Sequence, residues 1–146
     1  MIGLKSLSVC FIALLLLCPM SAHSEVTTEV YCFRSQEGKD INFEFRSYYD
    51  SVSKWSGASV KYSKSKEAIS LVYKDSEEEV LDPNRPSQFT TRWIEVSEGQ
   101  VTGDYGMVRQ GALIYAMVYT NHKSGKRYIF EHDSNMDSPP ETGCQW

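Results

Sequence analysis

Histidine and cysteine are scarce in this chain of 146 residues, which holds three histidines and four cysteines. The spacings typical of zinc sites, Cys-x-x-Cys, His-x-His and Glu-x-x-His, are all missing. The Gly-x-Ser-x-Gly elbow of many hydrolases is also missing, and the glycine-rich stretch "GQVTGDYG" lacks the lysine of a phosphate-binding loop. The sequence therefore predicts no enzyme activity, no metal and no cofactor, and it favours a protein that acts by binding.

Two alternatives to this prediction are a metal site at the histidines and a hydrolase site built from two carboxylates. His132 stands between Glu131 and Asp133, but neighbouring residues of a strand point to opposite faces, so these side chains do not converge on one metal. His122 falls in a turn-like stretch, where we expect a solvated imidazole. A hydrolase of the cell envelope that uses two of the 19 acidic residues stays an open alternative, although "DSEEEV" is more simply a solvated acidic edge.

Long apolar runs are missing from most of the chain, and the single one is short and lies at its start. Residues Val9–Leu17 are almost wholly apolar, Lys5 precedes them, and small residues stand at the positions needed for cleavage before Glu25. This pattern predicts a secretory signal peptide over residues 1–24, too short to span a bilayer. We expect export to the periplasm and no integral membrane segment in the mature chain. The alternatives are an uncut membrane anchor and lipid attachment at Cys18, which the large Leu17 disfavours.

Removal of the signal peptide leaves two cysteines, Cys32 and Cys144, one near each end of the mature chain. An even number of cysteines in an exported protein predicts a disulfide, and two cysteines alone do not make a tetrahedral zinc site. The loop between them holds 111 residues, 33–143. In the chain-entropy model, closing a loop of that length stabilises the fold by roughly 4–5 kcal/mol.

The mature chain, residues 25–146, has the length of a single domain. Lys5 is the only charged residue of the signal peptide, so the mature chain keeps 14 basic and 19 acidic residues, a formal charge of −5. Nucleic acid and anionic membranes both require a basic face. We therefore expect neither as a partner.

Apolar and polar residues alternate with a period of two along most of the mature chain. Stretches such as "TEVYCFR", "INFEFR", "QFTTRWIEV" and "GALIYAMVYT" are rich in the β-branched and aromatic residues that favour strands. Turn signals separate them, among them "SQEGKD", "LDPNRPSQ" and "NHKSG". We expect an all-β domain of seven or eight short antiparallel strands, arranged as a single sheet, a sandwich or a barrel, with only "SEEEVL" able to form a helical turn or two.

A basic segment stands out in this acidic chain. Lys54, Lys61, Lys64 and Lys66 lie within 13 residues, close to Trp55 and Tyr62. Ammonium groups beside aromatic rings suit binding to an acidic cleft of another protein. The alternatives are lysines that only protect an edge strand from pairing with other chains, and a tryptophan that belongs to the core.

"SGASVKYS" followed by "ISLVYKDSEEEVL" resembles the Ser-Gly-Ala-x-Tyr element and the following strand of bacterial C-type lysozyme inhibitors, as do "VYC" near the start and "GC" near the end. The resemblance implies a small periplasmic or lipid-anchored β-barrel with a disulfide. It implies that Ser56 and Lys74 enter the lysozyme cleft, while Gly57, Ala58 and Tyr62 shape the loop. The chain departs from the family where Tyr73 replaces the usual tryptophan.

In size, signal peptide, single disulfide and strand content, the chain is also similar to periplasmic immunity proteins of the pesticin type, which protect bacteriocin producers from their own muramidase. Both resemblances imply a protein that occludes an enzyme that cleaves peptidoglycan. The sequence-based hypothesis is therefore a periplasmic inhibitor or immunity protein with a protein partner. Its candidate binding residues are Trp55, Ser56, Gly57, Lys61, Tyr62 and Lys74. The alternative is a structural subunit of the envelope or of a pilus, built as a secreted β-sandwich.

Overall fold

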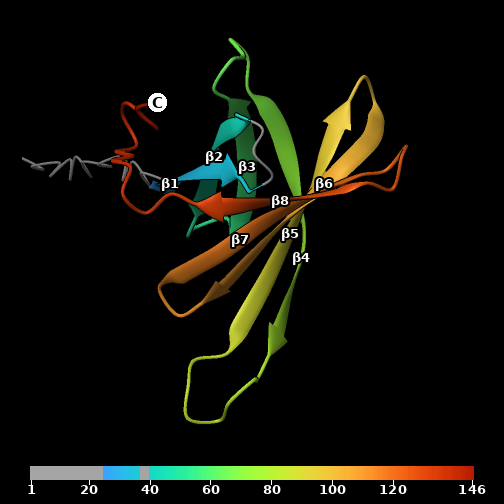
Figure 1. The fold of residues 1–146 in the computed structure, drawn as a ribbon. Helices are drawn as coiled ribbons and strands as arrows, with labels where there is room; N and C mark the ends of the chain where they lie inside the picture. Colours follow the sequence, from blue (N-terminus) through green and yellow to red (C-terminus); the bar gives the residue numbers. More distant parts are fainter. Residues whose placement is uncertain (1–24, 37–39) are drawn as a thin grey trace, which may run out of the picture.

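The computed structural model describes residues 25–36 and 40–146, so the predicted signal peptide lies outside the described residues. Within these ranges the chain is all β and contains no α-helix (Figure 1). No helix there is long and apolar enough to cross a membrane. The strands are β1 (Val26–Ser35), β2 (Asn42–Asp50), β3 (Trp55–Tyr62), β4 (Ile69–Glu79), β5 (Gln88–Ser97), β6 (Gln100–Gln110), β7 (Leu113–Asn121) and β8 (Arg127–His132).

The eight strands form one closed barrel in which each strand pairs antiparallel with its neighbour in sequence and β8 pairs with β1. Short connections allow only this up-and-down order. The structure confirms the all-β prediction and selects the barrel among the three arrangements considered. It also confirms "LDPNRPSQ" and "NHKSG" as connections, whereas "SEEEVL" is strand as far as Glu79 instead of helical. The expected turn "SQEGKD" falls partly on residues 37–39, outside the described residues.

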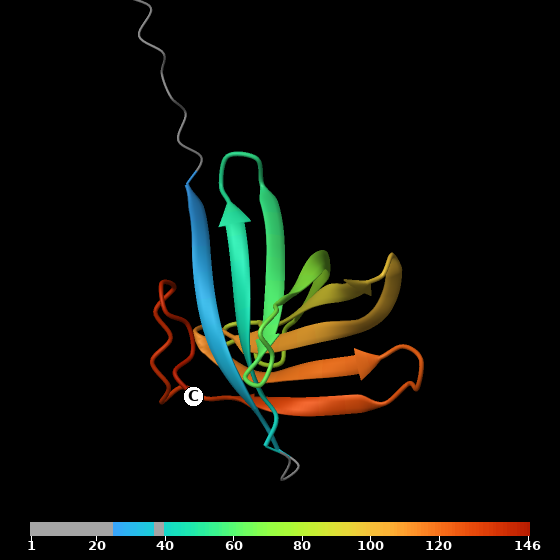
Figure 2. The same cartoon turned by 90° about the horizontal axis from the view of Figure 1, so that it is seen from above.

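Two seams of the barrel are short. β3 pairs with β4 only from Gly57↔Val72 to Val60↔Ile69, and β1 pairs with β8 at only three positions. Beyond these pairs the strands diverge: in Figure 2 the β2–β3 turn points in one direction and the β5–β6 and β7–β8 turns point in another. The end of the barrel opposite to the β5–β6 and β7–β8 turns carries the β2–β3 turn and the β4–β5 and β6–β7 connections; we call it the pocket end. We call the opposite end the tyrosine end, after residues described below.

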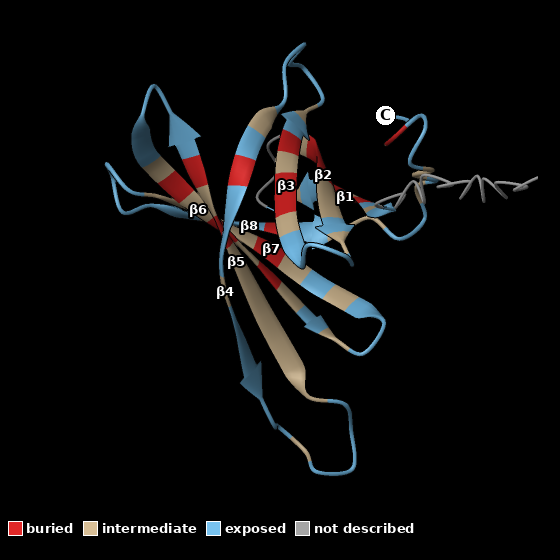
Figure 3. Ribbon diagram, turned by 180° about the vertical axis from the view of Figure 1, so that it is seen from behind, coloured by how far each residue is buried: buried red, intermediate tan, exposed pale blue. Residues whose placement is uncertain are grey.

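The core consists of inward-facing side chains at alternate positions of the strands (Figure 3). Phenylalanines dominate it: the ring of Phe43 stacks on Phe33 with centroids 5.2 Å apart and meets Phe130 edge-on at 4.8 Å. Each fully buried side chain of this kind contributes about 1.5–3 kcal/mol through the hydrophobic effect. The largest fully buried residues are Tyr105, Phe33, Phe43, Phe45, Met117, Val60 and Cys32.

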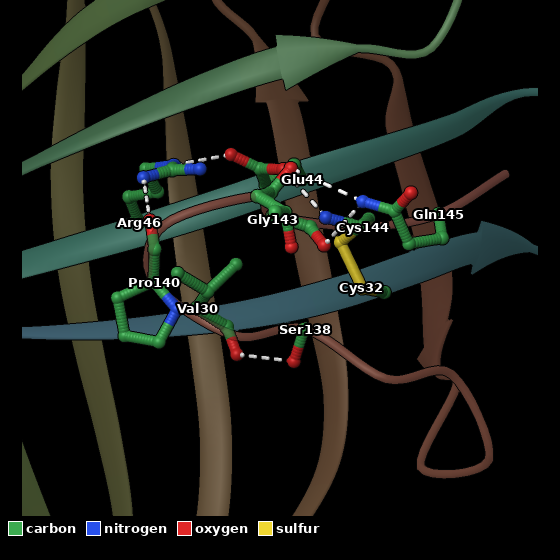
Figure 4. A network of polar contacts seen from close by, with 10 residues as sticks. Val30, Cys32, Glu44, Arg46, Ser138, Pro140, Gly143, Cys144 and Gln145 are labelled. Atoms are coloured by element: carbon green, nitrogen blue, oxygen red, sulfur yellow. Dashed lines mark hydrogen bonds and ion pairs between the residues drawn. A yellow bond between two sulfur atoms is a disulfide. The ribbon is translucent and has the colours of Figure 1, made fainter.

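The C-terminal segment after β8 crosses the outer face of β1 and β2 (Figure 4). The predicted disulfide between Cys32 and Cys144 is present, with the two Cα atoms 5.8 Å apart. Glu44 of β2 is buried beneath the segment, where it accepts a hydrogen bond from the backbone N–H of Cys144 at 2.8 Å and pairs with Arg46. Arg46 in turn donates to the carbonyl oxygen of Pro140 at 2.7 Å.

Gly143 lets the segment lie this close to the sheet. A Cβ at this position would overlap the Glu44 carboxylate, and the backbone φ of +71° favours glycine. A buried charge without partners is costly, and here Glu44 has both a cation and a backbone donor. The disulfide and the polar contacts of Glu44 and Arg46 therefore hold the C-terminal segment against β1 and β2.

Candidate functional site

The structure divides the six predicted binding residues between the two ends of the barrel. Trp55, Ser56 and Gly57 open β3 at the pocket end, whereas Lys61 and Tyr62 close the same strand at the tyrosine end. At about 3.3 Å per residue, the two groups are roughly 20 Å apart. They therefore lie at opposite ends of β3.

The four lysines of the basic segment are separated in the same way. Lys54 lies in the β2–β3 turn at the pocket end, with a backbone φ of +58°. Lys64 and Lys66 lie in the β3–β4 connection at the tyrosine end, where Lys64 is 3.6 Å from a carboxylate oxygen of Asp40. Lys61 is exposed on the outer face, opposite Glu44. The segment is basic in sequence, but it does not form a single cationic patch.

Trp55 is not a core residue: 56% of it is exposed, on the outer face of β3. The six-membered ring of its indole lies directly against Gly57, since a Cβ on Gly57 would overlap that ring. Gly57 pairs with Tyr48 of β2 and with Val72 of β4, so the indole rests between these two side chains. Val72 is itself 53% exposed. The glycine therefore creates the shelf on which an exposed tryptophan is held.

Lys74 lies beside this shelf, at the β-bulge of β4 between Tyr73 and Asp75. Its ammonium is 3.8 Å from a carboxylate oxygen of Asp104, and Nε2 of His122 is 3.4 Å from the same oxygen. Lys74 remains half exposed. We define the Trp55 patch as the exposed residues Val52, Lys54, Trp55, Val72 and Lys74. It contains two of the six predicted residues and borders Ser56 and Gly57.

A pocket of about 160 Å³ opens into the barrel beside the Trp55 patch. It lies where the two parts of the barrel diverge, so six of the eight strands contribute to its walls. Ser56 lines it, on the inner side of β3, and so does Gly57. The other lining residues are Glu29, Tyr31, Ser47, Tyr48, Tyr49, Tyr73, Thr91, Trp93, Met107 and Arg109.

The pocket carries one carboxylate and one guanidinium. Glu29 accepts a long hydrogen bond of 3.5 Å from Ser47. Burial, together with the adjacent Glu29 carboxylate, raises the pKa of Tyr31 to about 12, while Arg109 opposes that shift. Tyr31 is therefore a neutral hydroxyl in the wall of the pocket at physiological pH.

Trp93 forms the inner part of the same pocket. Only 6% of it is exposed, and its indole packs edge-on against Phe45 with ring centroids 4.9 Å apart. The indole N–H is buried and has no hydrogen-bond partner among the described residues. A buried polar group usually has a partner, because leaving it unpaired costs about 1–3 kcal/mol. This donor is thus an exception that requires a physical reason.

At the tyrosine end, in contrast, the buried polar groups have hydrogen-bond partners. Glu95 is buried and accepts hydrogen bonds from Thr102 at 2.6 Å and from the hydroxyls of Tyr105 and Tyr119 at 3.3 Å each. The hydroxyl of Tyr105 also lies 2.8 Å from that of Tyr62. Burial raises the pKa of Tyr62, Tyr105 and Tyr119 above the ordinary value. Tyr62, a predicted binding residue, is part of this internal network.

The inward-facing acids do not converge. Glu29 lines the pocket, while Glu95 belongs to the tyrosine network and does not line it. A glycosidase requires two carboxyl groups about 5–10 Å apart across one site. The described part of the chain also holds no group of three side chains able to bind a metal. The pocket end combines an exposed apolar shelf, two cations and a small polar pocket.

Sequence reasoning missed Val72, Tyr49, Tyr73 and the inner residues of the pocket. One signal was present: Leu71, Val72 and Tyr73 are consecutive apolar residues, and in a strand only alternate ones can face the core. Comparison with known proteins adds no further assignment, because no protein-family model, no curated protein and no solved structure matches this chain.

Proposed function

We propose that this chain is an exported inhibitor or immunity protein that neutralises a peptidoglycan-cleaving muramidase by covering its cleft. The Trp55 patch at the pocket end is the contact surface. The single observation that supports this proposal most strongly is the exposed indole of Trp55, which lies against Gly57 beside the exposed Val72. The resemblances to lysozyme inhibitors and to immunity proteins of the pesticin type supply the class of partner.

The apolar part of the patch has the composition of an interface centre. Tryptophan is the residue most enriched among those that dominate binding energy, and a rigid ring loses little conformational freedom when a partner covers it. Val72, 53% exposed, extends the apolar surface beside the indole, and Val52, 67% exposed, lies in the adjoining β2–β3 turn. Large exposed apolar residues gathered in one place mark interaction sites.

The charged part of the patch suits an acidic partner. Lys54 lies in the β2–β3 turn, and the half-exposed Lys74 lies beyond Val72. The acids nearest to Lys74 are engaged: Arg92 binds Asp75 at 2.7 Å and Glu77 at 2.6 Å. The exposed ammonium groups of Lys54 and Lys74 would favour encounter with a cleft lined by catalytic carboxylates.

The inhibitor resemblance assigns the deepest contacts to Ser56 and Lys74. Ser56 faces the pocket and Lys74 faces outward next to it, so both border the same rim of the barrel. Lys74 has to leave Asp104, 3.8 Å away, to enter a cleft. Lys74→Glu is expected to weaken the complex by roughly 2 kcal/mol or more, as for a close charge pair at an interface.

The decisive experiment is titration of the mature chain against purified muramidases, followed by cell-wall lysis. We expect stoichiometric inhibition of at least one of them. Trp55→Ala should raise the inhibition constant at least about tenfold, because a central tryptophan is worth about 2 kcal/mol or more. The matched control is Lys61→Ala, an exposed residue of the same strand at the tyrosine end, which should leave inhibition unchanged.

The proposal fails if no muramidase is inhibited or bound, or if Trp55→Ala inhibits as well as the wild type. The alternative of a structural pilus or envelope subunit remains a prediction that no contact among the described residues favours. Strand donation requires an open groove, whereas the described strands pair around a closed barrel. A chain that stays monomeric and folds without a chaperone would dismiss that alternative.

A further inference from the structure

We propose that the pocket at the pocket end receives one six-membered aromatic ring, the side chain of a phenylalanine or tyrosine of the protein partner. This inference rests on the proposed function for the identity of the partner, and it adds a second contact to the Trp55 patch. The resemblances assign the contact to residues of this chain that enter the enzyme, whereas here a residue of the enzyme enters this chain. Three features of the pocket support the assignment: its size, its wall and its mouth.

The size of the pocket matches a single ring. Its volume is about 160 Å³. A protein cavity of about 150 Å³ binds benzene, whereas drug-sized ligands occupy sites of about 300–1,000 Å³. Nucleotides and most lipids are thus too large to enter. A phenyl or phenol ring fills the pocket, while the backbone of the residue that carries the ring stays outside.

The wall of the pocket is rich in aromatic side chains. Trp93 and Met107 are its most buried side chains, with exposed fractions of 6% and 5%. Four tyrosines line the pocket as well: Tyr31, Tyr48, Tyr49 and Tyr73. Aromatic rings pack favourably edge-on or offset against one another, and a thioether sulfur packs favourably at the edge of a ring. The indole nitrogen of Trp93 has almost no accessible surface, so packing against the wall, and not a hydrogen bond to that nitrogen, would hold the guest.

The mouth of the pocket lies beside the exposed indole of Trp55. Pairing of β3 with β4 ends at Gly57 and Val72, so the two strands separate there. Ser56 and Gly57 line the pocket, and Gly57 also contacts the indole of Trp55. A protein that covers Trp55 therefore also covers the mouth. Interfaces commonly combine an exposed anchor residue with a pocket that receives an anchor residue of the partner.

The charges of the pocket favour an uncharged guest. Glu29 and Arg109 are both exposed and line the pocket, one with each sign of charge. A charged side chain of either sign would meet a like charge there and would lose water on entering. The half-buried hydroxyls of Ser47 and Thr91 can pair with the hydroxyl of a tyrosine. An aliphatic side chain such as leucine is the main competitor, but it lacks the flat face that suits an aromatic wall.

The test is a two-dimensional NMR titration of the isotopically labelled mature chain with phenol, the ring of the tyrosine side chain. The methyl signal of Met107, identified with Met107→Leu, is the reporter. A ring in the pocket should shift this signal through its ring current, in a saturable way and with the millimolar dissociation constant expected of so small a ligand. The signal of Met136, which follows β8, should stay in place. Cyclohexanol, which is matched in size but not aromatic, should bind at least about fivefold more weakly, as judged from the amide signals of Ser56 and Thr91.

Two variants locate the site. Ser47→Leu places an apolar side chain in the pocket and should abolish the phenol response. Tyr73→Ala removes one aromatic wall and should weaken the response at least about threefold. Because Tyr73 is 43% exposed, this variant should fold like the wild type even if Ser47→Leu does not. The matched control Ser97→Leu, exposed at the tyrosine end of β5, should leave the response unchanged. Trp55→Ala should also leave it unchanged, because Trp55 does not line the pocket.

Inhibition of the muramidase shows separately whether the partner supplies the ring. Ser47→Leu and Tyr73→Ala should each raise the inhibition constant at least about threefold, and saturating phenol should raise that of the wild type. If phenol binds but no muramidase is inhibited, the proposed function fails and the aromatic pocket stands. The pocket assignment is overturned if phenol gives no saturable shift, if cyclohexanol binds equally well, or if both variants inhibit like the wild type. A Met107 signal that moves when the protein alone is diluted would assign the ring to a second copy of this chain and would also overturn it.

Discussion

The two ends of this barrel use the same strands for different purposes. At the tyrosine end, the buried carboxylate of Glu95 receives three hydroxyl donors and Tyr105 is completely buried. At the pocket end, the strands diverge, the indole N–H of Trp93 is unpaired and a pocket of about 160 Å³ remains. One end pairs its buried polar groups, whereas the other keeps a buried indole N–H without a partner among the described residues.

The two ends differ because two of the strand pairings that close the barrel are short. Because β1 and β8 share only three paired positions and β3 and β4 only four, the barrel closes tightly along part of its length. Where the barrel is closed, inward-facing side chains from different strands touch one another and form the tyrosine network. Where it is open, they do not touch, and the pocket remains between them. The C-terminal segment compensates on the outside by fastening β1 and β2 through Cys32 and Glu44.

The largest effect on stability should come from removal of the disulfide that holds this segment. Replacement of Cys32 and Cys144 by alanine should lower the free energy of unfolding by about 4 kcal/mol, because a loop of 111 residues is no longer closed in the unfolded chain. Urea unfolding monitored by circular dichroism measures this loss. A double variant as stable as the oxidised wild type would show that the polar contacts of Glu44 alone hold the segment.

Replacing a buried tyrosine at the tyrosine end should lower the free energy of unfolding more than replacing an exposed tyrosine at the pocket end. Tyr105→Ala should cost about 3–5 kcal/mol, because it leaves a cavity in the core and removes a partner of Glu95. The matched control, Tyr49→Ala, lies at the pocket end with 42% of the residue exposed and should cost less than about 1 kcal/mol. Urea midpoints at constant m-value compare the two. Equal losses would contradict the assignment of stability to the tyrosine end.

Alkaline pH should destabilise the fold, mainly through the tyrosine end. Burial raises the pKa values of Tyr62, Tyr105 and Tyr119, so above about pH 10 the unfolded chain ionises while the folded chain does not. Stability is therefore complete below that pH and declines above it, by up to about 1.4 kcal/mol per pH unit for each protected tyrosine. Urea midpoints between about pH 8 and about pH 11 measure the slope.

Two variants with phenylalanine in place of tyrosine show which tyrosines cause the loss of stability at alkaline pH. Tyr105→Phe and Tyr31→Phe should each reduce the decline by a similar amount below about pH 11, because both tyrosines are still protonated there in the folded chain; burial raises the pKa of Tyr105 and raises that of Tyr31 to about 12. A slope that Tyr105→Phe leaves unchanged would contradict the role of the tyrosine network in the pH dependence.

The smallest effect on stability should come from Gly57→Ala. The added Cβ displaces the exposed indole of Trp55 but meets no buried atom, so the free energy of unfolding should change by less than about 1 kcal/mol. Affinity for the muramidase should nevertheless fall about tenfold, because the shelf that orients the indole is lost. Ala58→Gly, at the next position of β3, faces the core and serves as the control: it should reduce stability but not affinity. Unchanged affinity in Gly57→Ala would remove the shelf from the binding mechanism.

Much of the fold could be predicted from local patterns, whereas the site could be predicted only in part. Alternation of apolar residues gives strands, and counting cysteines gives the disulfide, because both depend on few residues. Closure of the barrel depends on three β1–β8 pairs that no local pattern encodes. Trp55, Ser56 and Gly57 could be selected from one stretch, but strand geometry then carries Lys61 and Tyr62 to the other end.

The pocket was beyond the reach of sequence patterns for a different reason. Glu29 belongs to β1, whereas Trp93 and Arg109 belong to the β5–β6 hairpin, so the three meet only once the barrel has closed. A single acidic or basic residue among many has no distinguishing context in the sequence. The missing partner of the Trp93 indole becomes visible only when its surroundings are known.

Amide hydrogen exchange of the mature chain, alone and bound to the muramidase that it inhibits, tests the division between the two ends most directly. The account predicts slower exchange in the complex for the β2–β3 turn, the start of β3 and the segment Val72–Lys74, with unchanged exchange around Tyr62 and Tyr105. Protection concentrated at the tyrosine end or along the C-terminal segment, with the Trp55 patch unaffected, would contradict it.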